Sequence, residues 1–136
     1  GAPNSAELVL DMMAQQTKGE ESDKSIHGAT WAVYEIAGRM VVAEDPPTLT
    51  LDQGGQFGLY GGCNRFSGEL DAGKGSFRMP ENFAGTMMAC PEDRERLERD
   101  TLEALSAATG YVRNGSNLAL TNEAGVPILR LREMPN

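Results

Sequence analysis

The chain has 136 residues, of which 40% are hydrophobic and 24% are charged, and this is the size and composition of one globular domain. Its 12 Lys and Arg against 20 Asp and Glu give a net charge of -8, which makes nucleic acid a poor partner because a phosphate backbone would be repelled. Cysteine and histidine are too scarce for a zinc site built from these two residue types, and no apolar stretch approaches the roughly 20 residues of a membrane-spanning helix.

The N-terminal part of the chain is expected to lie outside the folded domain. Because the chain begins with Gly1 rather than Met, we expect a processed N-terminus, and a signal peptide or lipid anchor could have preceded it. Residues 5–16 place apolar side chains at helical spacing and predict a short helix. Residues 17–25 contain no apolar side chain and are typical of a solvated linker. We therefore place an extension at residues 1–25 and the domain at residues 26–136.

The first part of the domain alternates polar and apolar residues at the period of β-strands. Residues 29–36 and 40–42, joined by a turn at Gly38, predict a hairpin of half-buried strands. Further strands are separated by turns rich in Gly, Asn and Asp, at residues 52–55, 71–75 and 122–125. About eight strands are predicted in all: residues 29–36, 40–42, 48–51, 57–60, 66–70, 77–79, 118–120 and 129–131.

One long helix is predicted over residues 91–109. Pro91 fits the first helical position, acidic residues follow it at the positive end of the helix dipole, and Gly110 is expected to cap the other end in the left-handed conformation. An apolar stripe should pack on the sheet while a charged face lies in water. The stripe is Leu97, Thr101, Ala104, Leu105 and Ala108, and the solvent face is Arg94, Glu95, Glu98, Arg99 and Glu103. The predicted fold class is α+β: a mostly antiparallel, barrel-like sheet of about eight strands with one long helix packed on it.

The segment Gly61–Gly68 is a candidate for a sharp corner between two strands. Its glycines permit positive φ angles, and Asn64 tolerates the left-handed region. A phosphate-binding loop would need Lys followed by Ser or Thr and then a helix, and none of these follows the corner. We therefore expect no nucleotide or other cofactor.

The two cysteines allow three interpretations. Cys63 lies in the corner and Cys90 at the start of the predicted helix. A disulfide would tie these two features together and stabilise the fold by roughly 3 to 4 kcal/mol in the chain-entropy model. Alternatively, one of them is a reactive thiol, or both are reduced, buried core residues. His27 could pair with a cysteine in catalysis, but no third residue to orient it is apparent, and we expect a solvated histidine at the start of the first strand.

Five segments, in this order along the chain, resemble the META domain of the HslJ-like heat-shock protein family. The Gly-Cys-Asn corner with its following Phe and Gly, and the segment Thr86–Pro91, are the most specific parts of the resemblance. The segments are Gly28–Trp31, Pro47–Leu51, Gly61–Gly68, Thr86–Pro91 and Leu118–Thr121. They contain the motif residues Trp31, Gly62, Asn64, Phe66, Gly68, Thr86 and Pro91, which we expect to be structural.

The resemblance implies a small antiparallel barrel with one helix, found in bacterial envelope proteins and often in lipoproteins. The family is not known as an enzyme, and is associated with heat-shock response and novobiocin resistance. We therefore expect a monomeric, non-catalytic protein of the periplasm or outer membrane, without a metal site, that presents a surface or cavity to a lipid chain or an envelope protein segment. The alternatives are a thiol-dependent enzyme that uses Cys90 or Cys63, and an interaction module whose acidic surface binds a basic partner.

Overall fold

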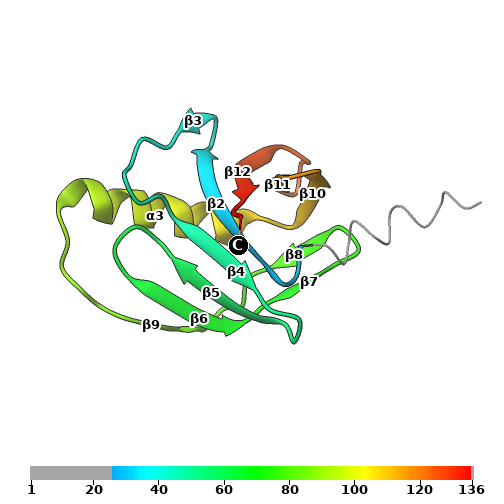
Figure 1. The fold of residues 1–136 in the computed structure, drawn as a ribbon, viewed down its shortest axis with the longest axis horizontal. Coiled ribbons are helices and arrows are strands. Elements are labelled where there is room, and N and C mark those ends of the chain that lie inside the picture. Colours follow the sequence, from blue (N-terminus) through cyan, green and yellow to red (C-terminus); the bar gives the residue numbers. More distant parts are fainter. Residues whose placement is uncertain (1–25, 136) are drawn as a thin grey trace, which may run out of the picture.

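Antiparallel pairing runs through the whole sheet of this protein. The computed structural model describes residues 26–135. Eleven strands form one sheet that curls into a half-barrel, and a single helix, α3, packs against it (Figure 1). The predicted fold class is confirmed. The short helix and the linker predicted within residues 5–25 lie outside the described residues.

The strands are short, and three of them were not expected from the sequence pattern. β7 and β9 contain three and two residues, too few to show an alternation, and β10 has one buried side chain, Tyr111. In chain order the elements are β2 (Ala29–Ile36), β3 (Arg39–Met40), β4 (Thr48–Leu51), β5 (Gln56–Tyr60), β6 (Arg65–Glu69), β7 (Asp71–Gly73), β8 (Ser76–Arg78), β9 (Ala84–Gly85), α3 (Glu92–Ala107), β10 (Gly110–Asn114), β11 (Asn117–Thr121) and β12 (Pro127–Glu133).

The first described strand lies in the middle of the sheet. The strand order is β7-β8-β10-β11-β12-β2-β4-β5-β6-β9, and β3 pairs with β2 outside this path. On one side of β2, Val33 lies opposite Leu131 of β12, and on the other side Trp31 lies opposite Leu49 of β4. The two halves of the curled sheet are therefore joined through β2.

The prediction of a half-buried strand over residues 40–42 is wrong, because only Met40 of these residues is in a strand and it is 66% exposed. β3 pairs with β2 only at Glu35 and Ile36, and Val42 is 94% exposed. β4 pairs with the same edge of β2, at residues 29–32, so the chain has to leave that edge after β3 to let β4 reach it. Residues 41–46 therefore form a loop, exposed at residues 42–45, instead of the rest of a strand.

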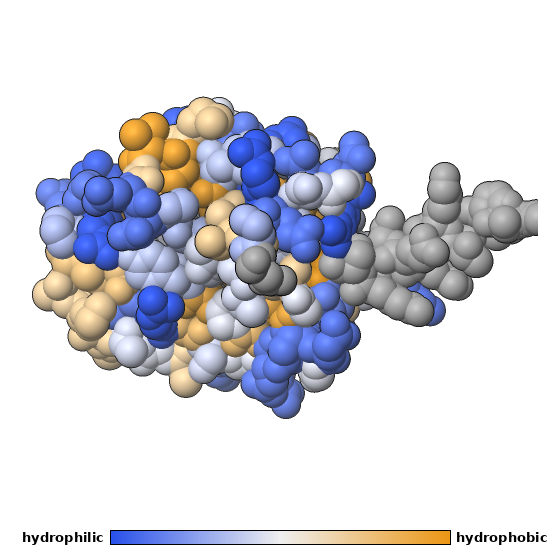
Figure 2. Space-filling model, in the orientation of Figure 1, coloured by the Kyte–Doolittle hydropathy of each residue, from blue (hydrophilic) through white to orange (hydrophobic). Residues whose placement is uncertain are grey.

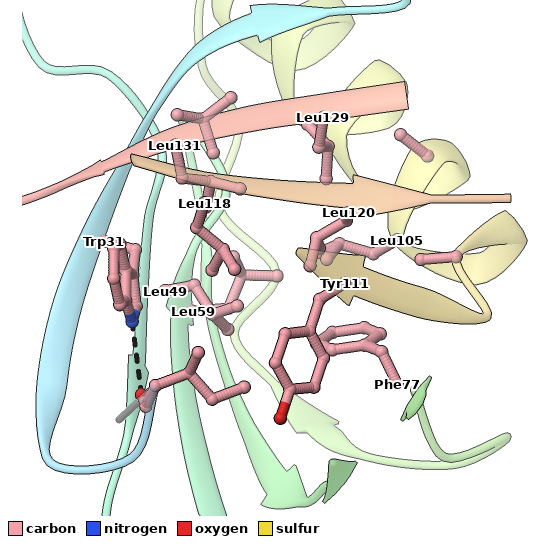
Figure 3. Packing of buried hydrophobic residues seen from close by; sticks show 14 of the residues in the cluster. Trp31, Leu49, Leu59, Phe77, Leu105, Tyr111, Leu118, Leu120, Leu129 and Leu131 are labelled. Carbon is pink, nitrogen blue, oxygen red and sulfur yellow. Dashed lines mark hydrogen bonds between the residues drawn. The ribbon is translucent and has the colours of Figure 1, made fainter. Parts of the chain in front are cut away.

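Alternate residues of the strands point into the half-barrel and fill it with large apolar side chains (Figure 3). Trp31 from β2, Leu120 from β11 and Leu131 from β12 are all 0% exposed. The helix contributes Leu105, which is 1% exposed. The buried side chains form one hydrophobic cluster, to which most of the strands and the helix contribute.

The helix ends earlier than predicted and without the predicted cap. α3 stops at Ala107, and the N–H of Ala108 bonds to the carbonyl of Leu105 at 3.2 Å while Ala108 itself is extended. Gly110 is the first residue of β10 and has no positive φ. A Cβ atom there would lie 3.0 Å from the carbonyl oxygen of Gly75, so this glycine serves close strand packing rather than capping.

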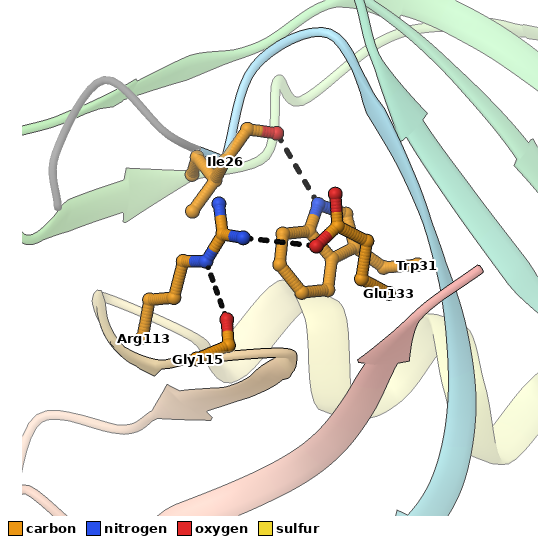
Figure 4. Close-up of polar contacts among 5 residues, drawn as sticks. All are labelled: Ile26, Trp31, Arg113, Gly115 and Glu133. Atoms are coloured by element: carbon orange, nitrogen blue, oxygen red, sulfur yellow. Dashed lines mark hydrogen bonds and ion pairs between the residues drawn. The ribbon is translucent and has the colours of Figure 1, made fainter. Parts of the chain in front are cut away.

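A set of polar contacts surrounds Trp31 (Figure 4). The indole N–H donates to the carbonyl of Ile26 at 3.2 Å, and the guanidinium of Arg113 lies over the ring, 4.9 Å from its centroid. Arg113 also donates to the carbonyl of Gly115 and pairs with Glu133 at 2.9 Å. These contacts link the entry of the domain to β10 and to the end of β12.

We expect Leu120→Ala to lower the free energy of unfolding by about 2 to 5 kcal/mol, because the side chain is fully buried and its removal leaves a cavity in the core. Denaturant unfolding followed by tryptophan fluorescence measures this change. The matched control is Val112→Ala in β10, whose side chain is 62% exposed, and it should cost less than about 1 kcal/mol. Equal effects of the two substitutions would contradict this description of the core.

Candidate functional site

The predicted corner joins β5 to β6 through residues 61–64. Gly62 has a φ of 120°, which is strained for any other residue, and a Cβ atom there would lie 3.2 Å from the carbonyl oxygen of Arg94. Cys63 and Asn64 follow it and are 2% and 9% exposed. The glycine thus lets the corner approach the first turns of α3 closely enough to bury the next two side chains.

The structure joins Cys63 and Cys90 in a disulfide, with their Cα atoms 6.0 Å apart. This is the first of the three interpretations of the cysteines, and both cysteines of the described residues are used in it. The bond ties the corner to the residue that precedes Pro91, the N-cap position of α3. Neither sulfur is therefore a thiol in this form of the protein.

His27 is not the solvated residue that the sequence suggested. It is half-buried, and its two ring nitrogens lie 3.2 Å and 3.1 Å from the carbonyl oxygens of Asp52 and Ala72. These contacts attach the entry of the domain to the turn after β4 and to β7. The imidazole therefore has a structural position, and its contacts within residues 26–135 do not include either cysteine.

Glu98 was predicted to face water, and this prediction is wrong. Its side chain is on the buried face of α3 and the residue is 9% exposed. One carboxylate oxygen accepts the backbone N–H groups of Cys63 and Asn64, and the other accepts the side-chain amide of Asn64 at 2.9 Å. The reason is that the corner packs on this face of the helix and brings N–H donors that a carboxylate can satisfy.

Asn64 extends this network to residues 84–90, which we call the strap. Its side-chain oxygen accepts hydrogen bonds from the hydroxyl of Thr86 at 2.9 Å and from the backbone N–H of Met88 at 2.6 Å. The same hydroxyl accepts the N–H of Arg65 at 3.1 Å. Helix, corner and strap are therefore held together by one connected set of hydrogen bonds in addition to the disulfide.

A second polar group fixes the outer side of the corner. Arg94 donates from Nε to the carbonyl of Gly62 at 2.9 Å and from Nη2 to the hydroxyl of Tyr60. The Tyr60 hydroxyl in turn donates to the Gly62 carbonyl, and the Arg65 guanidinium lies 5.2 Å from the centre of the Tyr60 ring. Two cationic side chains are thus held in place around one aromatic ring.

Two hollows open on the surface next to this assembly. The first, of about 580 Å³, lies between the loop after β3 and α3, and the second, of about 720 Å³, lies between that loop and the strap. They share Glu44, Asp45 and Arg94 in their linings. Figure 2 shows hydrophobic surface over the loop after β3 and over the segment between β9 and α3. Four exposed apolar side chains line the hollows: Met40 and Val42 in the first, Met88 and Met134 in the second.

The predicted motif residues fall into three places. Gly62, Asn64, Thr86 and Pro91 meet around the disulfide, whereas Trp31 lies in the core. The other two are in β6. Phe66 packs edge-to-face on Phe83, with ring centroids 5.7 Å apart, and a Cβ atom on Gly68 would lie 3.0 Å from the Cβ of Phe83.

The sequence interpretation missed Glu98, Arg94 and Tyr60. For Glu98 a signal was present, because it precedes Thr101 by three positions and Leu105 by seven, and so shares a helix face with two residues of the apolar stripe. An acidic residue on the buried face of a helix indicates that N–H donors from another segment lie beside it. Arg94 and Tyr60 give no such signal, since the contact between them depends on the path of the corner.

Within residues 26–135, no three His, Cys, Asp or Glu side chains gather in a way that could hold a metal ion. In the same part of the chain, no helix has the length and apolar character needed to cross a membrane.

Comparisons with known proteins give a family from the sequence and a shared fold from solved structures. The sequence model of the META domain family matches residues 24–135. A protein from Burkholderia xenovorans, solved by NMR, superposes with a TM-score of 0.63 at 23% identity, covering 100% of this chain and 99% of that one. A DUF4847 family protein from Bacteroides vulgatus gives a TM-score of 0.61 at 17% identity, covering 79% of this chain and 94% of the other. No curated protein sequence matches the chain significantly.

We expect Glu98→Gln to lower the free energy of unfolding by about 1 to 3 kcal/mol, because a buried amide replaces an acceptor with a donor that faces the N–H groups of the corner. Chemical denaturation of the oxidised protein measures the loss. Glu103→Gln, an exposed position on the same helix, is the matched control and should change stability by less than about 0.5 kcal/mol. A loss no larger at position 98 than at position 103 would show that the network is not formed.

Replacing both cysteines with alanine should lower the free energy of unfolding by about 3 to 4 kcal/mol, because the bond closes a loop with a sequence separation of 27. Denaturant unfolding of the variant and of the reduced parent protein should give similar losses. In an Ellman assay, the denatured but unreduced parent should show no free thiol. Two free thiols in protein purified under air would contradict the disulfide.

Proposed function

The chain belongs to the META domain family, and from this premise we propose that it is a non-catalytic domain of the bacterial cell envelope that presents its two surface hollows to a segment of another protein. The observation that carries the proposal is the set of exposed apolar side chains, Met40, Val42, Met88 and Met134, in the linings of hollows that adjoin the disulfide. Methionine side chains adapt to partners of irregular shape, which suits such a surface.

A protein segment fits these hollows better than a lipid chain. The inside of the half-barrel, which could otherwise enclose an acyl chain, is filled by core side chains such as Trp31 and Phe77. Both hollows also combine apolar side chains with charged ones, among them Glu44, Asp45 and Arg94. A polypeptide offers apolar side chains, backbone amides and charges together, so it can match a mixed lining of this kind.

The state of the cysteines supports a non-catalytic role and an envelope location. A thiol-dependent enzyme would use Cys90 or Cys63 as a nucleophile, and here the two sulfurs are bonded to each other. Disulfides persist in oxidising compartments such as the periplasm. The association of the resembled family with heat shock and novobiocin resistance supports a role under envelope stress.

The test is selection of a phage-displayed library of short random peptides on the immobilised, oxidised protein. Synthetic copies of the enriched peptides should bind the parent protein, and the double variant V42S/M88S should bind them about tenfold or more weakly, because apolar contact is lost in both hollows. V112S is the matched control, since Val112 is exposed in β10 and lines neither hollow. Its affinity should stay within about twofold of the parent.

Two outcomes would overturn the proposal. Failure to enrich any peptide, or equal loss of binding in V112S, would remove the hollows as a peptide site. Saturable binding of a pyrene-labelled fatty acid that is lost in V42S/M88S and kept in V112S would instead assign the hollows to a lipid chain. Iodoacetamide labelling of the native protein in air separates the enzyme alternative, because a disulfide is not alkylated and a catalytic thiol is.

A further inference from the structure

The strap, residues 84–90, begins with β9, which is the last strand in the order, and so it continues from an outer edge of the sheet. Three of its backbone N–H groups, at every second residue, have partners within the domain. Thr86 donates to the carbonyl of Arg65 at 3.0 Å, Met88 to the side chain of Asn64 at 2.6 Å, and Cys90 to the carboxylate of Glu95 at 3.1 Å. In an extended chain the intervening residues direct their N–H and carbonyl groups to the opposite side.

Met87 and Ala89 are two of those intervening residues. Both are exposed, and Met87 is 96% exposed. Neither the N–H nor the carbonyl of either residue takes part in the backbone hydrogen bonds of residues 26–135. These two residues therefore have backbone donors and acceptors that are free to pair with another chain.

This edge lacks the features that usually prevent strands from pairing with other chains. Exposed edges commonly carry a charged side chain or a proline, and residues 84–90 contain neither. The edge is also held rigid, since Thr86 and Met88 bond to Asn64 and Cys90 is in the disulfide. A rigid edge loses little conformational entropy when another segment pairs with it.

We propose that the strap binds an extended segment of another polypeptide by strand addition, with Met87 and Ala89 exchanging backbone hydrogen bonds with it. The inference rests on the proposed function, since it specifies how a protein segment is held beside the second hollow, to which Met88 belongs. Backbone pairing supplies affinity, and the exposed side chain of Met87 supplies an apolar contact.

The charges on either side of the strap select the partner. Glu81 precedes it and Asp93 follows it; both are exposed, and neither is in an ion pair within residues 26–135. The nearby cations Arg65 and Arg94 are held by Tyr60, in the strand beyond β6. We therefore assign a partner segment with small or apolar residues in its centre and Lys or Arg at both ends.

A second copy of this chain fits less well. Two straps paired antiparallel would place the Glu81 end of one beside the Asp93 end of the other, so that like charges meet at both ends of the pair. The same charges attract a segment with basic ends. Charge complementarity thus favours a different polypeptide over self-association.

The probe is a capped peptide of alternating Val and Thr with Lys at both ends, titrated into the full, oxidised chain labelled with 15N. Binding should shift the amide signals of Met87 and Ala89 and slow their hydrogen exchange. The same peptide with Glu at both ends should bind about tenfold more weakly. A peptide with N-methyl groups along one edge should still bind through its other edge, whereas N-methylation of both edges should abolish binding.

The matched protein variants are Met87→Pro, which removes the outward N–H, and Met87→Ala, which keeps it. Met87→Pro should weaken binding about tenfold and Met87→Ala about twofold or less. Thermal unfolding of both variants checks that they are folded. The N-methylated peptides test strand addition on the parent protein, so the test does not depend on the variants.

The outcomes separate this inference from the proposed function. Peptide binding that is unchanged when the peptide is N-methylated, but is lost in V42S/M88S, would overturn strand addition and keep the hollows as a peptide site. Binding that depends on N-methylation and on Met87→Pro, yet is unchanged in V42S/M88S, would support strand addition and reject the hollows. Absence of binding, or dimerisation of the chain that Met87→Pro abolishes, would overturn the proposed partner.

Discussion

The carboxylate of Glu98 determines how helix, corner and strap come together. It lies on a helix face that otherwise carries apolar residues, and it accepts three N–H groups from Cys63 and Asn64. A buried carboxylate without these donors would be strongly unfavourable, and the donors without the carboxylate would be unsatisfied. Each side of the contact therefore requires the other, which specifies where the corner rests on the helix.

Covalent and non-covalent links act on different parts of the same assembly. The disulfide limits the distance between Cys63 and Cys90, whereas the hydrogen bonds of Asn64 to Thr86 and Met88 set the orientation of the strap. Together they hold in place a surface on which large apolar side chains are exposed. Such preorganisation is what a small domain needs if it is to bind a segment through a modest contact area.

Much of the fold could be predicted from the sequence because local patterns decide it. β11 alternates between buried and partly exposed residues along its length, β2 and β12 do so over part of theirs, and the helix has a clear apolar stripe. The errors arise where distant segments compete or meet. The strand after Gly38 stops early because β4 occupies the same edge of β2, Gly110 is a glycine because of the close approach of Gly75, and Glu98 is buried because the corner covers it. None of these causes lies within the local sequence.

The central place of β2 has a consequence for how the chain acquires its structure. Its neighbours are β4, close in sequence, and β12 at the other end of the chain, as the 95-residue separation between Glu35 and Arg130 illustrates. Pairing across such a separation has a large loop-closure entropy and slows folding. The half-barrel can therefore close only after its last strand has been synthesised. Until then one edge of β2 lacks its partner strand and the apolar side chains of β2 are not covered by those of β12.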